Sequence, residues 1–147
     1  MVEIFFACDK MKMLRITPFV TQLNTNEIFV FGSNEAGRHG RGAAKLAKKW
    51  GAISGVGEGL QGNTYGIPTK NTKIQTLSKE KISNHVQRFI TFAKERPELI
   101  FLVTEIGCGL AKYTAKDIAP LFYDCQGMEN VYLPLSFWNI ISNPSVK

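Results

Sequence analysis

The sequence is poor in the residues that build metal sites and disulfide frameworks. It has 2 histidines and 3 cysteines in 147 residues. The histidines, His39 and His85, stand in none of the paired cysteine or histidine spacings that bind metals. An odd number of cysteines, with an N-terminus that lacks the basic and apolar regions of a signal peptide, argues against a disulfide framework. We therefore expect a cytoplasmic protein that needs no metal and no cofactor.

Long apolar runs and the common nucleotide motifs are also missing. No window approaches the roughly 20 apolar residues that span a bilayer. The chain contains no GxxxxGK[ST] motif, and the spacing of Gly37, Gly40 and Gly42 differs from GxGxxG, which argues against a Walker-type triphosphatase and a dinucleotide-binding Rossmann site. The formal net charge of +6 and the pI near 9.3 instead favour an anionic partner, such as a nucleotide, a phosphate group or nucleic acid.

Short apolar runs alternate with amphipathic segments. Residues 27–33, 99–104 and 130–134 are typical of strands covered on both faces. Residues 43–50 predict a short helix closed by Gly51, and Ser78 predicts the start of a longer helix with His85 on its exposed side. A third helix is expected to start near Asp117 rather than at Thr114, because Pro120 is tolerated only in a first turn. This alternation predicts an α/β sandwich in one domain.

Two glycine-rich segments follow two of these predicted strands. They are GSNEAGRHGRGAAK, residues 32–45, and IGCGLAKYT, residues 106–114. Ligands of parallel sheets bind outside the carboxyl ends of the strands, and glycine lets backbone N–H groups approach an anion closely. The two segments therefore predict phosphate-binding loops, the alternative being that they are only tight turns. Cys108 is a further candidate as a nucleophile, if a base lies near it in space.

The pairing of FVFGSNEAGRHGRGAAKLA with VTEIGCGLAKYTAKDIAPLF resembles the bacterial and phage macro-domain-like proteins, relatives of the macrodomains that recognise ADP-ribose. The resemblance covers residues 18–138, and IGCGL is its most specific part, being similar to the diphosphate loop of macrodomains that remove ADP-ribose. It implies a three-layer α/β/α sandwich with a mostly parallel mixed sheet in a single domain, residues 1–147, with residues 1–13 as an accessory extension.

The resemblance also implies roles for individual residues. Asn34 matches the asparagine that meets the distal ribose, whereas Ala111 stands where hydrolases of this kind tend to have an acid. The expected catalytic residues are Asn34, His39 as a general base and Glu58 as a substitute acid, unless His39 is solvated and Glu58 lies in a hairpin-like surface connection. The expected ligand-binding residues are Gly32, Ser33, Asn34, Gly37, Arg38, Gly40, Arg41, Gly42, Ile106, Gly107, Cys108, Gly109, Leu110, Lys112 and Tyr113.

The expected function is binding of ADP-ribose or a related NAD-derived nucleotide, with hydrolysis of an ADP-ribosyl bond as its stronger form. The partners would be this small molecule and ADP-ribosylated macromolecules, with no membrane. Two alternatives stay open. One is a basic accessory protein that binds nucleic acid, motivated by the net charge. The other is a non-catalytic sensor or sink for a signalling nucleotide.

Overall fold

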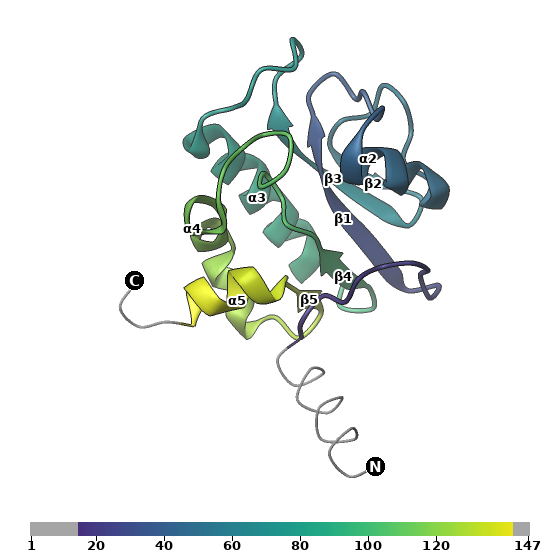
Figure 1. Ribbon diagram of the computed structural model, residues 1–147. Helices are drawn as coiled ribbons and strands as arrows, with labels where there is room; N and C mark the ends of the chain where they lie inside the picture. Colours follow the sequence, from purple (N-terminus) through teal and green to yellow (C-terminus); the bar gives the residue numbers. More distant parts are fainter. Residues whose placement is uncertain (1–14, 143–147) are drawn as a thin grey trace.

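A computed structural model describes residues 15–142 of the chain (Figure 1). Among these residues, no helix has both the length and the apolar character to cross a membrane. In chain order the elements are β1 (Glu27–Asn34), α2 (Gly42–Ala47), the 3₁₀ turn η1 (Lys48–Trp50), β2 (Gly59–Gln61), β3 (Thr64–Lys70), α3 (Lys79–Lys94), β4 (Ile100–Val103), α4 (Ala115–Ile118), the 3₁₀ segment η2 (Ala119–Gly127), β5 (Val131–Tyr132) and α5 (Leu135–Ile141).

The strands form one five-stranded sheet in the order β2-β3-β1-β4-β5. The central strand β1 pairs in parallel with both β3 and β4, and β4 pairs in parallel with β5. Only β2, at one edge, runs antiparallel to its neighbour β3. The predicted mostly parallel mixed sheet is therefore confirmed, and the carboxyl ends of β1, β3 and β4 lie at the same edge.

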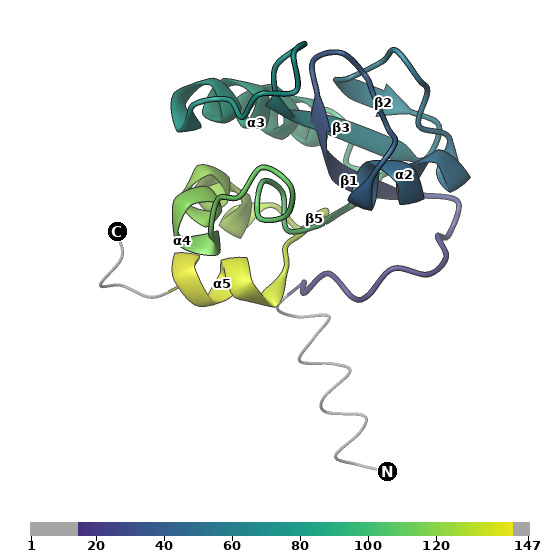
Figure 2. The same cartoon turned by 45° about the horizontal axis from the view of Figure 1, so that its top comes forward.

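Strand β1 is apolar on both faces because helices cover both. Ile28 and Val30 belong to a core shared with α3, η2 and α5. Phe29 and Phe31 point to the other face and pack in a smaller core with α2. Each such fully buried side chain contributes roughly 1.5–3 kcal/mol relative to an exposed one. Figure 2 shows α2 on one side of the sheet and α3, α4 and α5 on the other, so the predicted α/β sandwich is confirmed.

Local signals for the first two helices are also confirmed, with one exception. Gly51 has a φ of 113° at the end of η1, and the Ser78 hydroxyl accepts a hydrogen bond from the Lys81 N–H at the start of α3. His85, expected at the surface, is only 7% exposed. It is buried on α3 because two carboxylates reach it from neighbouring loops, as described below.

The predicted start of the third helix is wrong. Helix α4 begins at Ala115, and the Asp117 carboxylate accepts hydrogen bonds from both the N–H and the hydroxyl of Thr114, each at 3.0 Å. The α-helical turn then ends at Ile118, and Pro120 lies at the beginning of the 3₁₀ segment η2. Pro120 is tolerated there because the chain has changed helix type, so its missing N–H falls in a new first turn.

Residues 55–69, where the sequence left open a hairpin-like surface connection around Glu58, contain an inner strand of the sheet. β2 and β3 do form a hairpin, but β3 is buried and pairs with β1. Gly66 and Pro68 lower its strand propensity. Gly66 is required all the same, since a Cβ there would lie 2.7 Å from the Gly57 carbonyl oxygen.

Candidate functional site

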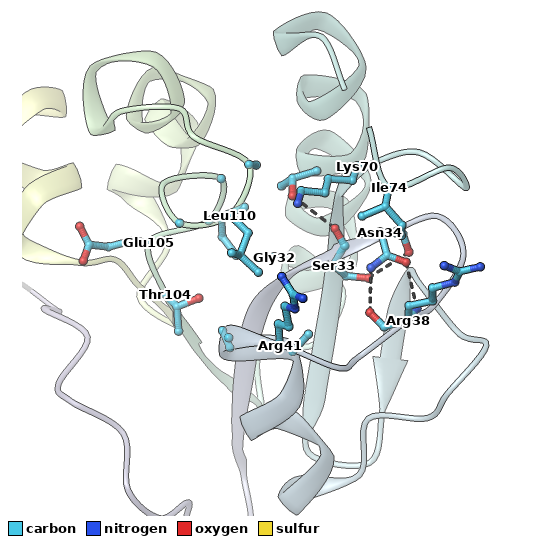
Figure 3. A pocket seen from close by; sticks show the side chains of 18 of the residues that line it. Gly32, Ser33, Asn34, Arg38, Arg41, Lys70, Ile74, Thr104, Glu105 and Leu110 are labelled. Carbon is cyan, nitrogen blue, oxygen red and sulfur yellow. Dashed lines mark hydrogen bonds between the residues drawn. The ribbon is translucent and has the colours of Figure 1, made fainter. Parts of the chain in front are cut away.

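A pocket of about 660 Å³ opens where the carboxyl ends of β1, β3 and β4 meet (Figure 3). Volumes of roughly 300–1,000 Å³ are typical of small-molecule sites. The pocket combines the end of β1, the first glycine loop, the start of α2, the end of β3 and the second glycine loop. It is lined by Gly32, Ser33, Asn34, Arg38, Gly40, Arg41, Gly42, Ala43, Ala44, Thr69, Lys70, Ile74, Thr104, Glu105, Ile106, Gly107, Gly109, Leu110 and Ala111.

Asn34 shapes the first loop with its own side chain. Its Nδ2 donates to the Arg38 carbonyl oxygen at 2.8 Å, and its Oδ1 accepts from the Arg38 N–H at 2.9 Å. A carboxamide has two N–H donors and two oxygen lone pairs. Asn34 therefore closes the turn after β1 and keeps one donor and one acceptor available where it lines the pocket.

Both glycine loops offer unpaired backbone donors. Within residues 15–142, the N–H groups of Gly40, Arg41, Gly109, Leu110 and Ala111 make no hydrogen bond to the protein. Backbone N–H groups are strong donors that need a partner, and successive free ones form a concave anion site. The pocket is therefore lined by donors from two loops that a bound anion can satisfy.

The charged side chains of the pocket are mostly cationic. Arg38, Arg41 and Lys70 line it, and Glu105 is the acidic lining residue among those that the structure describes. The Glu105 carboxylate accepts a hydrogen bond from the Ser136 hydroxyl at 2.9 Å, and Figure 3 shows it on the side away from Asn34 and Arg38. The electrostatics of the pocket thus favour an anionic ligand.

His39 does not line the pocket. Its imidazole is only 3% exposed and stands edge-on to Phe31. Its Nε2 lies 3.1 Å from the Ile53 carbonyl oxygen and 3.0 Å from that of Val56, so Nε2 carries the proton. Its Nδ1 is buried without a partner among the described residues. The His39 imidazole thus holds residues 53–56 against the first loop. Its burial outside the pocket does not fit the expected role of a general base.

Glu58 also lies outside the pocket, in a group of ionisable residues that we call the α3 cluster: Glu35, Glu58, His85 and Arg88. Glu58 Oε2 is 2.8 Å from His85 Nδ1 and 2.9 Å from Arg88 Nε, and Glu35 Oε2 is 3.4 Å from His85 Nε2. Burial would raise the pKa of Glu58, but hydrogen bonds from Arg88 and His85 hold it below its usual value of 4.5. The Glu58 carboxylate is thus engaged by His85 and Arg88 outside the pocket, and this position does not fit the expected role of a substitute catalytic acid.

Four of the predicted ligand-binding residues lie outside the pocket lining: Gly37, Cys108, Lys112 and Tyr113. Gly37 packs against Gly55, and the Tyr113 hydroxyl donates to the Leu77 carbonyl oxygen. Cys108 packs against the larger core, and burial, followed by Glu105 and Asp117, raises the pKa of its thiol to about 11. Cys108 is therefore protonated at neutral pH, which argues against a nucleophile. The predicted residues that the structure brings together are Gly32, Ser33, Asn34, Arg38, Gly40, Arg41, Gly42, Ile106, Gly107, Gly109 and Leu110.

Sequence reasoning missed the part of the site that β3 supplies. Thr69, Lys70 and Ile74 line the pocket, as do Thr104 and Glu105 after β4. The signal available was the apolar stretch before Thr69. Had residues 64–70 been read as a buried parallel strand, its carboxyl end would have joined the other two.

A second, more apolar pocket of about 380 Å³ adjoins the first and shares Ala43, Thr104 and Glu105 with it. Residues 17–20 form one wall, and Phe29 lies in its lining. Phe19 in that wall is 93% exposed. The second pocket thus places apolar surface next to the cationic lining of the first.

Comparisons of this chain with protein-family models, with curated proteins and with solved structures found no match.

Proposed function

We propose that the larger pocket binds ADP-ribose or a related NAD-derived nucleotide, with its diphosphate between the two glycine loops. The observation that carries this proposal is the set of unpaired N–H groups on both loops of one pocket. Arg38, Arg41 and Lys70 add three cations around it. Two phosphates with delocalised negative charge match donors that come from two directions.

The rest of the pocket suits the other parts of such a ligand. Asn34 retains one donor and one acceptor, the pair that a ribose hydroxyl needs. The adjoining apolar pocket, with Phe19 and Phe29, suits a flat purine base. The resemblance of IGCGL to a diphosphate-binding loop points in the same direction.

Binding is favoured over hydrolysis because the described pocket lining has few groups that can act as a catalytic acid or base. The described lining contains no histidine, and its carboxylate, Glu105, is hydrogen-bonded to Ser136. Ala111 occupies the position at which the resemblance implies an acid in hydrolases. The groups that would position and deprotonate water therefore have no clear equivalent, and we propose a binder or a nucleotide sink.

The test is calorimetric titration with ADP-ribose at 150 mM salt, for the unchanged protein and Gly109→Val. A Cβ on Gly109 would meet nothing within 4 Å, so the valine enters the open pocket without straining the fold. We expect micromolar affinity that Gly109→Val weakens more than tenfold. Gly127→Val, also into open space but outside the pocket lining, is the control and should bind normally. No heat from the unchanged protein, or equal affinity for Gly109→Val, would contradict the proposal.

A second candidate function is nucleic-acid binding, favoured by the +6 charge and by Lys45, Lys48 and Lys49, which are exposed on α2 and η1. It predicts affinity for an oligonucleotide that falls steeply with salt. It also predicts that Gly109→Val leaves this affinity unchanged, whereas a triple Lys→Gln variant of the three lysines lowers it.

A further inference from the structure

Ile74 has a backbone conformation that its side chain disfavours. Its φ is 61°, in the left-handed region. A β-branched residue rarely adopts this region, because Cβ approaches the following carbonyl oxygen too closely. Such strain persists only where the surroundings impose it, and it concentrates at functional sites.

A compact hairpin after β3 imposes this conformation. Asn71 N–H donates to the Gln75 carbonyl oxygen, and Ile74 N–H donates to the Asn71 carbonyl oxygen. The Asn71 Oδ1 also accepts from the N–H groups of Lys73 and Gln75, at 2.9 and 3.0 Å. In a three-residue hairpin loop of this kind the left-handed position normally holds glycine or asparagine. The turn therefore calls for a different residue from the one present.

Core packing does not explain the isoleucine either. Ile74 is half-buried, yet among the described residues it packs against neither of the two core clusters. It lines the larger pocket instead. Figure 3 shows it grouped with Asn34 and Arg38 on the side away from Glu105. Its side chain is an apolar surface at a part of the pocket where the other named side chains are polar or charged.

We infer that Ile74 contacts the bound ligand and determines specificity at the Asn34 end of the pocket. This inference rests on the proposed function and deepens it. The hairpin of residues 71–75 holds the isoleucine against the apolar face of the ligand's sugar, while Asn34 meets the hydroxyl groups. The hairpin is tied to the second loop, since the Thr76 hydroxyl donates to the Ala111 carbonyl oxygen at 3.3 Å. Ile74 therefore has a fixed position relative to the proposed diphosphate site.

The first measurement is urea unfolding of the unchanged protein, Ile74→Asn and Ile74→Val. Asparagine tolerates the left-handed region, so Ile74→Asn should lower the unfolding equilibrium constant about fivefold. Valine keeps the β-branch and the strain, so Ile74→Val should show no such gain. An unfolding constant that rises in Ile74→Asn would overturn the inference, because the isoleucine would then support the fold.

The second measurement is titration of the same proteins with ADP-ribose. Removing the apolar contact should weaken binding about tenfold in Ile74→Asn, and less in Ile74→Val. The signature of the inference is thus a variant that gains stability and loses affinity. Ile53→Asn is the matched control: Ile53 is 54% exposed and outside the pocket lining, and both quantities should stay within about twofold of the unchanged protein.

Titrations with ADP and ribose 5-phosphate separate failure of the inference from failure of the proposed function. Equal affinity of Ile74→Asn and the unchanged protein for a ligand that binds would overturn the inference alone. If ADP-ribose does not bind but another probe does, and Ile74→Asn weakens that probe, the inference stands and the proposed function fails. If none of the three probes binds, both are rejected.

Discussion

The two glycine loops of the pocket and the α3 cluster both contain polar groups that the sequence predicted to belong to the site, and their surroundings in the structure are opposite. In the α3 cluster each ionisable side chain has a partner: Glu58 lies against His85 and Arg88, and Glu35 against His85. In the loops, the backbone N–H groups of Gly40 and Gly109 have none within the described chain.

This difference separates groups that hold the fold from groups that the fold leaves available to a ligand. Paired charges connect α3 to the loops that follow β1 and precede β2, whereas unpaired donors with nearby cations remain at the strand ends. A titratable residue near a glycine loop in sequence is therefore weak evidence for a site. The stronger evidence is a polar group that the fold exposes in a pocket and leaves unsatisfied.

The largest expected effect tests whether the segment next to the α3 cluster is purely structural. A Cβ on Gly57 would lie 2.0 Å from the Asn34 carbonyl oxygen, so Gly57→Ala must displace the first loop. We expect a loss of about 3 kcal/mol in the free energy of unfolding, measured by urea denaturation. Gly127→Ala, where the added Cβ meets nothing, is the control. A Gly57→Ala variant as stable as the unchanged protein would contradict this expectation, because the contact between Gly57 and Asn34 would then tolerate a side chain.

The second prediction concerns the side chain that separates the two glycines of the second loop. With the pKa of Cys108 raised from 9.0 to about 11, its thiolate fraction at pH 7.5 falls about 100-fold. Alkylation by iodoacetamide, followed by peptide mass spectrometry, should be at least roughly tenfold slower than for the same cysteine in the urea-unfolded protein, because the smaller thiolate fraction outweighs the higher nucleophilicity of a more basic thiolate. Rapid alkylation would mean that the Cys108 thiol is accessible and has a low pKa, and the nucleophile hypothesis would return.

A charge in the pocket should affect binding and leave stability alone. Arg41 is exposed and lines the pocket. Arg41→Gln should therefore lower the affinity for ADP-ribose about tenfold, because one charge-assisted hydrogen bond is lost. The free energy of unfolding should change by less than about 0.5 kcal/mol. Lys94→Gln makes the same charge change at the end of α3, outside the pocket lining, and should bind normally. Equal losses in the two variants would indicate a general charge effect.

Removing a charge from the α3 cluster should lower stability slightly and leave ligand binding unchanged. Glu58→Gln should cost about 1 kcal/mol of stability, since Glu58 and Arg88 are both partly exposed, and leave affinity unchanged. The pKa of Glu58 is lowered on folding, so its contribution is present above pH 4.5 and is lost as pH falls below that value. Urea unfolding at pH 7 and pH 3.5 should therefore show a steeper loss for the unchanged protein. Equal pH dependence of the two proteins would contradict this role.

The sequence was sufficient for elements whose signals are local. The apolar run of β1, the Ser78 cap of α3 and the left-handed Gly51 are each decided by neighbouring residues, and all three predictions are confirmed. The resemblance to macro-domain-like proteins, and the function that it implies, remain predictions.

The sequence was insufficient where long-range packing decides. Strand β3 contains Gly66 and Pro68, and it is a strand because β1 provides a partner along its length. His39 and Glu58 each stand next to glycines in the sequence, which is typical of a functional site. In the structure, however, His39 contacts backbone carbonyl groups and Glu58 contacts α3. Which way a loop side chain turns depends on elements far away in the chain, and spacing alone does not report it.

The central position of β1 has a consequence for how the chain folds during synthesis. Strand β1 leaves the ribosome early, with apolar side chains on both faces, but its partners β3 and β4 end only at Lys70 and Val103. A sheet built from such distant pairings folds slowly, in roughly milliseconds to seconds. Until β3 and α3 emerge, Ile28 and Val30 stay uncovered on a strand with two free edges, where a nascent chain is most prone to aggregate. Lower growth temperature should therefore raise the yield of folded protein.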